Sequence, residues 1–279
     1  MRVRDERLSW AEDHLQQCRK IALRYFGTRL RVEAKADQSP VTIADRTIEE
    51  YLRRELGRAF PGDAIIGEEF GPPAEWSGDE AGSSAKSPTS YWTIDPIDGT
   101  RAFSRGLPSW GILLAHVQRN QPTLAACEFP MFQTFLGVGP GQVAYERRGE
   151  GRRLPLAKAA KPPALSRTVI FHGGSGWWLK GPHATGFTKL VRQCFLERAY
   201  GDCYAFLWAF RGNADAVIDC GVKIWDLAPF AALARATGRV LVDFSNRPSF
   251  TGPEAILAHP VLARQIAAIL NENKKVRSP

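Results

Sequence analysis

The segment from Trp92 to Thr100 constrains this chain most, because an apolar run there carries two aspartates, Asp95 and Asp98, into a Gly-Thr turn. Two carboxylates at the end of a strand, with a backbone carbonyl between them and open amides after them, can hold hard cations and a phosphoryl group together. The alternative is an ordinary strand followed by an Asp-Gly turn. The segment alone leaves both interpretations open.

Two further acidic segments favour the first interpretation. Glu68 and Glu69 follow the short apolar run at 64–66, so we expect them at a strand end. Asp226 precedes another apolar stretch and is expected to be a helix N-cap, with Pro229 in the first helical turn. Each acid has an ordinary explanation by itself, as a solvated loop residue or a cap. Together the three segments supply the oxygen-rich ligand set that two divalent cations need.

These residues resemble the inositol monophosphatase superfamily of magnesium-dependent, lithium-sensitive phosphomonoesterases. The matching segments follow the family's order and approximate spacing over most of the chain, at residues 40–45, 67–69, 95–100, 203–218 and 225–226. The resemblance implies an α/β fold, the layered α-β-α-β-α sandwich of the sugar phosphatases, with the site between two halves. It also implies a small phosphate-ester substrate and a homodimer.

Within the superfamily, residues 67–71, 98–103, 201–204 and 223–226 are similar to the histidinol-phosphate phosphatases of this fold, which belong to histidine biosynthesis. Ala102 stands where many inositol phosphatases carry Asn. Asp219 departs from the expected Glu, and a side chain shorter by one methylene reaches a different substrate atom. The alternatives on the same fold are an inositol monophosphatase and a nucleotide or sugar bisphosphate phosphatase.

The resemblance assigns metal-binding roles to oxygen donors from the three segments. Asp95 would bridge two Mg²⁺ ions, Glu68 and the Ile97 carbonyl would complete the coordination of one ion, and Asp98 and Asp226 would hold the other. Two such ions are expected per site.

The resemblance also implies catalytic and substrate-binding residues. The Thr100 hydroxyl, assisted by Asp45, would orient the attacking water, and Glu69 would hold an outer-sphere water or a third, weaker cation. Amides at the start of a short helix would take phosphate oxygens. The substrate-binding candidates are Ile97, Asp98, Gly99, Thr100, Arg101, Asp202 and Asp219, of which the last two would pair with an amine. Asp202 is equally interpreted as the cap of a helix starting near Cys203.

Composition argues against other classes of protein. The 37 basic and 29 acidic residues give a net charge of +8, but the basic residues form short pairs, which predicts a solvated surface and no nucleic-acid partner. No apolar run reaches the roughly eighteen residues of a membrane span, and the start lacks a signal-peptide core, so a cytoplasmic protein is expected. A non-catalytic phosphate-binding protein and a nucleic-acid-binding module remain the other hypotheses.

Periodicity along the chain predicts two halves, residues 1–157 with most metal ligands and residues 158–279 with Asp226 and the alcohol-binding residues. Helices are expected at 8–26 and 43–59, the second capped by Thr42, and a long loop at 71–90. Short apolar runs at 111–145 predict an antiparallel sheet. Beyond that, strands at 168–171, 216–218 and 240–244 alternate with helices at 187–194, 204–211, 227–236 and 260–270, which is an α/β pattern.

Overall fold

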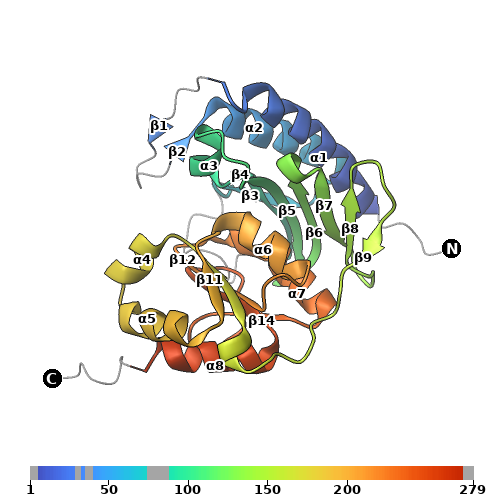
Figure 1. Cartoon of the computed structure of the whole chain (residues 1–279). Coiled ribbons are helices and arrows are strands. Elements are labelled where there is room, and N and C mark those ends of the chain that lie inside the picture. Colours follow the sequence, from blue (N-terminus) through green and yellow to red (C-terminus); the bar gives the residue numbers. More distant parts are fainter. Residues whose placement is uncertain (1–5, 29–32, 35–39, 74–87, 273–279) are drawn as a thin grey trace. The chain divides into compact units, whose positions relative to one another are not determined.

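The structure, a computed structural model, describes residues 6–28, 33–34, 40–73 and 88–272 of the 279-residue chain (Figure 1). Contacts divide the chain into two compact units. The first contains Met1–Pro155 and Ile224–Leu233, and the second contains Leu156–Lys223 and Ala234–Pro279. The expected division at 157 lies close to Pro155, but the segment that carries Asp226 groups with the first unit.

The first unit is built on a seven-stranded sheet in the order β3-β4-β5-β6-β7-β8-β9. Its strands are β3 (Ala64–Gly67), β4 (Ser90–Asp98), β5 (Gly111–Gln118), β6 (Gln121–Phe129), β7 (Thr134–Val138), β8 (Tyr145–Arg148) and β9 (Leu154–Pro155). Strand β3 pairs with β4 in parallel, and every other neighbouring pair is antiparallel. The antiparallel sheet expected at 111–145 is therefore confirmed. A separate two-stranded sheet joins β1 (Glu33–Ala34) to β2 (Pro40–Val41).

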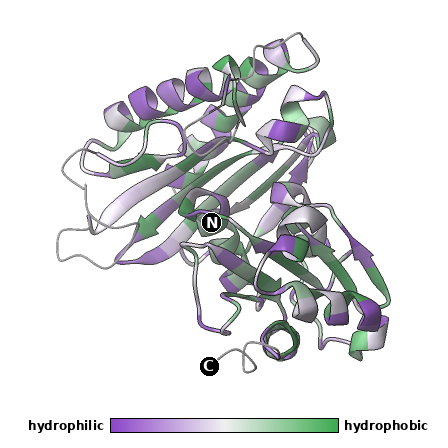
Figure 2. Ribbon diagram, turned by 90° about the vertical axis from the view of Figure 1, so that its left-hand side faces the viewer, coloured by the Kyte–Doolittle hydropathy of each residue, from purple (hydrophilic) through white to green (hydrophobic). Residues whose placement is uncertain are grey.

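Helices α1 (Glu6–Tyr25) and α2 (Ile43–Ala59) cover one face of this sheet (Figure 1). The apolar stripe of α1 is buried at Leu8, Leu15 and Ala22, in one core cluster with Trp92 of β4. Figure 2 shows the strands as mainly hydrophobic, whereas the two helices alternate hydrophilic and hydrophobic residues. Both expected helices are confirmed, including the N-cap of α2 at Thr42. The 3-10 helix Pro130–Phe132 connects β6 to β7.

The second unit contains a five-stranded sheet in the order β11-β10-β12-β14-β13. Its strands are β10 (Val169–His172), β11 (Leu196–Arg198), β12 (Ala216–Cys220), β13 (Val240–Val242) and β14 (Glu254–Ala258). Strands β11, β10 and β12 are parallel, whereas β14 is antiparallel to both of its neighbours. The helices are α4 (Ser175–Lys180), α5 (Ala184–Gln193), α6 (Asp202–Phe210) and α8 (Pro260–Leu270), with a 3-10 turn at Leu165–Arg167. A second core cluster joins α5 and α8 to the sheet.

The strands and helices expected after residue 158 are all present, but the strands β11 and β14, the helix α4 and the 3-10 turn at Leu165–Arg167 were not expected. The expected loop at 71–90 falls mostly outside the described residues, since residues 74–87 are not described. Within the described part of the chain, none of the helices combines the length and the apolar character needed to cross a membrane. The mixed α/β class is confirmed.

Candidate metal and phosphate site

A β-bulge in β4 brings Asp95 and Asp98 to the same side of the sheet. Asp95 lies opposite Leu113 and Asp98 opposite Gly111, so β4 advances three residues while β5 advances two. Successive side chains of a regular strand alternate between faces, and a spacing of three would separate the two carboxylates. The extra residue cancels that alternation. Pro96 is tolerated there because bulges are among the few sheet positions that do not need its missing N–H.

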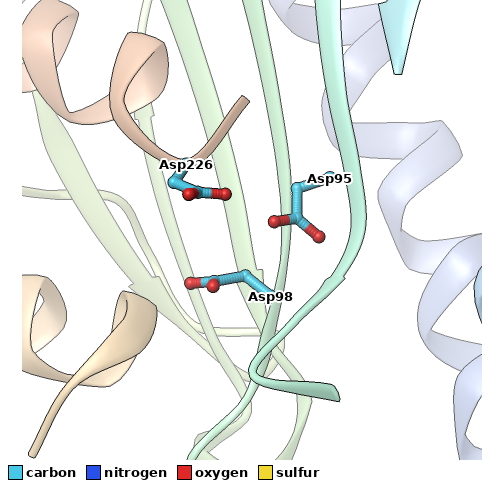
Figure 3. A group of neighbouring side chains, drawn as sticks. All are labelled: Asp95, Asp98 and Asp226. Atoms are coloured by element: carbon cyan, nitrogen blue, oxygen red, sulfur yellow. The ribbon is translucent and has the colours of Figure 1, made fainter. Parts of the chain in front are cut away.

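The third carboxylate comes from α7 (Ile224–Thr237), whose first ten residues belong to the first unit. Ligand oxygens of Asp95, Asp98 and Asp226 all lie within 4.8 Å of one another. Figure 3 shows the three side chains converging from β4 and α7. We call this group the aspartate cluster. Sequence segments about 130 residues apart thus meet at one point, as the oxygen-rich ligand set requires.

The expected N-cap role of Asp226 is wrong. Helix α7 begins two residues earlier, at Ile224, so Asp226 lies inside its first turn and Pro229 lies inside the helix. Acidic residues are favourable throughout the first turn because they face the positive end of the helix dipole, so residue type alone does not mark the cap. Pro229 cannot donate to the Trp225 carbonyl, so the helix lacks that backbone hydrogen bond one residue before Asp226.

The aspartate cluster is electrostatically unfavourable by itself. Asp95 is 2% exposed, and its Oδ1 atom has no hydrogen-bond partner among the described residues. Burial raises the pKa of the Asp95 carboxyl well above its ordinary range, and the charges of Glu68, Asp98 and Asp226 raise it further. Buried charge of one sign is costly unless an opposite charge compensates for it. A cation bound among these oxygens would supply that compensation, and an all-oxygen donor set suits Mg²⁺ better than zinc.

The other two expected metal ligands lie beside this cluster. Gly67 pairs with Ile94 across the parallel strands, and the Glu68 N–H donates to the Ile94 carbonyl at 3.1 Å. Glu68 thereby lies next to the strand position of Asp95 and acts on its pKa, although its carboxylate is not one of the three clustered groups. The Ile97 carbonyl accepts a hydrogen bond from the Thr100 hydroxyl at 3.0 Å.

Thr100 and Asp45 are joined directly. The Thr100 hydroxyl lies 3.3 Å from Asp45 Oδ1, while Asp45 Oδ2 accepts the Thr42 N–H at 2.8 Å and the Thr42 hydroxyl at 2.5 Å. Asp45 is the N3 residue of α2 and forms a capping box with Thr42. Burial raises the pKa of Asp45 to about 6, the Thr42 hydrogen bonds oppose that rise, and the charge of Glu68 adds to it.

The short helix expected after Gly99 is α3 (Thr100–Ser104). Gly99 is its N-cap and has φ +88°, a left-handed conformation that favours glycine. The first N–H groups of a helix have no partners within it, so they are available to an anion. Arg101, a phosphate-binding candidate, is the second residue of α3 and is exposed.

The two candidates for binding the alcohol lie in the second unit. Asp219, in β12, is 7% exposed, and its Oδ1 accepts the Cys220 N–H at 2.8 Å. A Cβ on Gly173 would lie 2.1 Å from Asp219 Oδ1, so this glycine makes room for the carboxylate, whereas one on Gly201 would lie at an ordinary contact distance of 3.9 Å from Oδ2. Asp219 therefore lies beside Gly201, the residue before Asp202.

The alternative in which Asp202 caps α6 is wrong. Gly201 is the N-cap, no side-chain capping hydrogen bond is present, and Asp202 is the first residue of the helix. Asp202 has φ +55°, whereas a capping residue has extended backbone. Few non-glycine residues adopt this conformation, and such strain often accompanies functional sites.

Comparison with known proteins shows which family the chain belongs to. The profile of the inositol monophosphatase family matches residues 4–275. The chain belongs to this family. It is 30% identical to a histidinol-phosphatase of Mycobacterium tuberculosis over 249 residues, which are 89% of this chain and 91% of that protein. Members of the family are phosphoric monoester hydrolases that act on small phosphate esters, and so this chain is one of these enzymes.

Solved structures support the same fold. The IMPase of Thermotoga maritima has a TM-score of 0.79 and 22% identity, covering 97% of this chain and 99% of its own. An IMPase/NADP phosphatase complexed with Mg²⁺ and phosphate has a TM-score of 0.77 and 18% identity, covering 95% and 93%. The expected fold of the family is therefore confirmed.

One buried acid near the site was not among the sequence candidates. Glu49 is fully buried and accepts the backbone N–H groups of Glu69 and Phe70. Its spacing of four residues from Asp45 on α2 places both on one helix face, and that spacing is the signal that could have identified it.

Proposed function

We propose that this member of the family is a magnesium-dependent histidinol-phosphate phosphatase. The observation that carries the proposal is the convergence of Asp95, Asp98 and Asp226 in a chain similar to a histidinol-phosphatase over nearly its whole length. The carboxylates of Asp202 and Asp219 would pair with a charged amine, which favours this substrate over a neutral polyol. A cytoplasmic homodimer is part of the proposal.

The metal-binding residues in this proposal are Glu68, Asp95, the Ile97 carbonyl, Asp98 and Asp226, holding two Mg²⁺ ions. When bound, Mg²⁺ supplies Lewis-acid polarisation of the phosphoryl group and lowers the pKa of coordinated water. The orphaned Oδ1 atom of Asp95 and the mutual repulsion of the three carboxylates fit such ions. Glu69 is proposed to hold an outer-sphere water or a third cation.

Thr100 and Asp45 are proposed to position the attacking water. The single proton of the Thr100 hydroxyl is directed at Ile97 O or Asp45 Oδ1, which leaves lone pairs on Oγ1 to accept a hydrogen bond from water. Asp45, with a pKa of about 6, can take up a proton near neutral pH. The amides after Gly99, together with Arg101, are proposed to bind phosphate oxygens.

Asp202 and Asp219 are proposed to bind the charged amine of the substrate. A charge-assisted hydrogen bond is worth about 1.5–3 kcal/mol, so replacing either carboxylate by an amide should weaken binding of a cationic substrate about tenfold. A neutral polyol gains less from these carboxylates than a cationic amine does. Phosphate release can therefore be compared across a substrate panel of histidinol phosphate, inositol phosphate, fructose bisphosphate and adenosine bisphosphate. The comparison shows which of these alcohols the enzyme prefers.

The test measures phosphate release from this panel and from a simple aryl phosphate. We expect the highest kcat/KM with histidinol phosphate, and a roughly tenfold higher KM for it in Asp202→Asn and in Asp219→Asn, with aryl phosphate turnover almost unchanged. Asp243→Asn is the matched control, because Asp243 lies in the same unit and pairs with Arg247. Equal kcat/KM for histidinol and inositol phosphates would contradict the substrate assignment and leave the family activity.

A further inference from the structure

Glu49 lies at the centre of the loop that follows β3. Its Oε2 atom accepts the Glu69 N–H at 2.8 Å, and its Oε1 atom accepts the Phe70 N–H at 3.2 Å. Arg53, one helical turn later on α2, donates to the same Oε1 at 2.8 Å and to the Gly71 carbonyl at 2.6 Å. Both oxygens of a fully buried carboxylate are thus used to hold one short stretch of backbone.

The loop is shaped to receive this carboxylate. A Cβ at Gly67 would lie 1.9 Å from Glu49 Oε1, so no other residue fits there while Glu49 keeps its position. Gly67 and Gly71 close the loop through backbone hydrogen bonds of 3.0 Å and 3.4 Å. The residues between them therefore wrap around the end of the Glu49 side chain.

The same loop carries Glu68 to the edge of the aspartate cluster, where its charge raises the pKa of Asp95. Glu68 is fixed on one side by its N–H bond to the Ile94 carbonyl, next to Asp95. It is fixed on the other side by the Glu49 contacts to the two following amides. A carboxylate that ligates a metal must be held by a supporting shell, and loss of such support typically costs about 10–100-fold in metal affinity.

We infer that Glu49 is a positioning residue for the metal site, which sets the place of Glu68 and Glu69 by holding the backbone of residues 67–71. The inference rests on the proposed function, because it assumes that Glu68 ligates Mg²⁺. In this role Glu49 would act on the ions only through the backbone that it holds. Its carboxylate works through two backbone amides and one arginine.

Glu49→Gln tests the inference with little change in side-chain volume. Glutamine has one acceptor oxygen where glutamate has two, so its NH₂ group must face either the Glu69 N–H or the Phe70 N–H and Arg53. We expect amide hydrogen exchange at Glu69 and Phe70 to become at least about tenfold faster. In calorimetric titration with MgCl₂ alone, we expect about tenfold weaker binding.

Kinetics provide a second measurement. The Mg²⁺ concentration for half-maximal hydrolysis of an aryl phosphate should rise about tenfold in Glu49→Gln, while kcat at saturating Mg²⁺ stays within about twofold. A residue that only stabilised the fold would not separate metal affinity from kcat in this way. Glu50→Gln is the matched control, because Glu50 is the next residue of α2 and is exposed, and it should behave like the unmodified protein.

Gly67→Ala gives an independent variant that keeps Glu49 in the chain. Its methyl group would occupy the place of the Glu49 carboxylate and displace it, so the same rise in loop exchange and loss of Mg²⁺ affinity is expected. Unchanged Mg²⁺ affinity in either folded variant would overturn the inference. Weaker Mg²⁺ binding in both variants of a protein that releases no phosphate would support the inference and contradict the proposed function. Absence of Mg²⁺ binding by the unmodified protein would contradict both.

Discussion

Two groups of buried carboxylates in the first unit differ in the sign of the charges around them. In the aspartate cluster, every neighbouring charge that acts on Asp95 is another carboxylate, and each one raises its pKa. In the second group, which we call the arginine cluster, Glu12 and Glu128 meet arginines from distant parts of the unit. Its ion pairs are Arg147 with Glu12 at 2.7 Å, Arg153 with Glu12, and Arg19 with Glu128 at 3.5 Å.

The arginine cluster balances its acidic charges with arginines of the protein, although Nη2 of Arg147 has no hydrogen-bond partner among the described residues. Glu12 on α1 also accepts the Tyr145 hydroxyl at 3.0 Å, so a helix is tied to β8 by charge-assisted hydrogen bonds. Burial raises the pKa of Glu128 to about 7, and Arg19 and Arg147 oppose that rise. Such a network joins elements and needs no added ion.

The difference shows how a structural group of acids can be told from a ligand-binding one. Both groups contain buried carboxylates, so burial alone does not distinguish them. The deciding property is the sign of the neighbouring charges, because a buried anion surrounded by anions is stable only with an added cation. The two groups should therefore respond oppositely to neutralisation of a carboxylate.

The largest expected effect is that of Asp95→Asn. Activity should fall by at least roughly a thousandfold, because the shared anion of both proposed metal sites is lost. The metal-free protein should unfold at the same or a higher temperature than the unmodified one, since a buried and repelled charge is removed. The rise in Tm on adding MgCl₂, which reflects preferential binding to the folded state, should disappear. Thermal melts with and without MgCl₂, together with phosphate release, measure all three.

Glu12→Gln is the control from the arginine cluster. Removing one partner of a buried ion pair leaves the other charge uncompensated, which typically costs about 3–5 kcal/mol. This variant should therefore lose stability with and without MgCl₂ and keep its Mg²⁺ affinity. If Asp95→Asn destabilised the metal-free protein as Glu12→Gln does, the contrast between the clusters would be wrong.

A smaller effect, about a hundredfold loss of turnover, is expected for Thr100→Ala. The hydroxyl is neutral and is proposed to orient water, so its removal should reduce kcat with little change in Mg²⁺ affinity. Ser104→Ala is the matched control, because the Ser104 hydroxyl donates to the Arg101 carbonyl at 3.0 Å, just as Thr100 donates to Ile97 three residues before it. Normal turnover of Thr100→Ala would limit this hydroxyl to its structural hydrogen bonds with Ile97 O and Asp45 Oδ1.

Most elements of the fold could be predicted from periodicity, and the misses have physical causes. Helix α2 was predicted at its observed bounds because its cap and apolar stripe agree. Strand β14 was missed because Glu, Ala and Leu favour helices, and its strand conformation comes from pairing with β12 and β13. Strand β11 has only three residues, and α4 contains a glycine and two tryptophans, so neither gives a clear periodic signal.

The composition of the candidate site could be predicted, but its geometry could not. Residue types and motif order indicated Asp95, Asp98 and Asp226. A spacing of three on a strand would place the first two on opposite faces, and only the bulge in β4 brings them together. Glu49 was missed because two of its partners are backbone amides, and its spacing of four residues from Asp45 is the one signal that the sequence carries.

The smallest expected effect concerns the pH dependence of stability in the arginine cluster. The folded-state pKa of Glu128 is about 7, above the ordinary value of 4.5, so the folded protein binds more protons than the unfolded chain between these pH values. Stability from this group is therefore present at low pH and lost as the pH rises through 7. Integrating that difference from about pH 5 to about pH 7 gives a loss of about 2 kcal/mol.

Glu128→Gln removes this titration and isolates its contribution from that of every other group. Urea unfolding at pH 5, 6 and 7 should show the free energy of unfolding of the unmodified protein falling relative to that of Glu128→Gln by about 2 kcal/mol. Glu50→Gln, which changes an exposed acid, should leave the pH dependence unaltered. A constant difference between Glu128→Gln and the unmodified protein across this range would mean that Arg19 and Arg147 already compensate the charge of Glu128 in full. The arginine cluster would then be more completely neutralised, and its contrast with the aspartate cluster sharper.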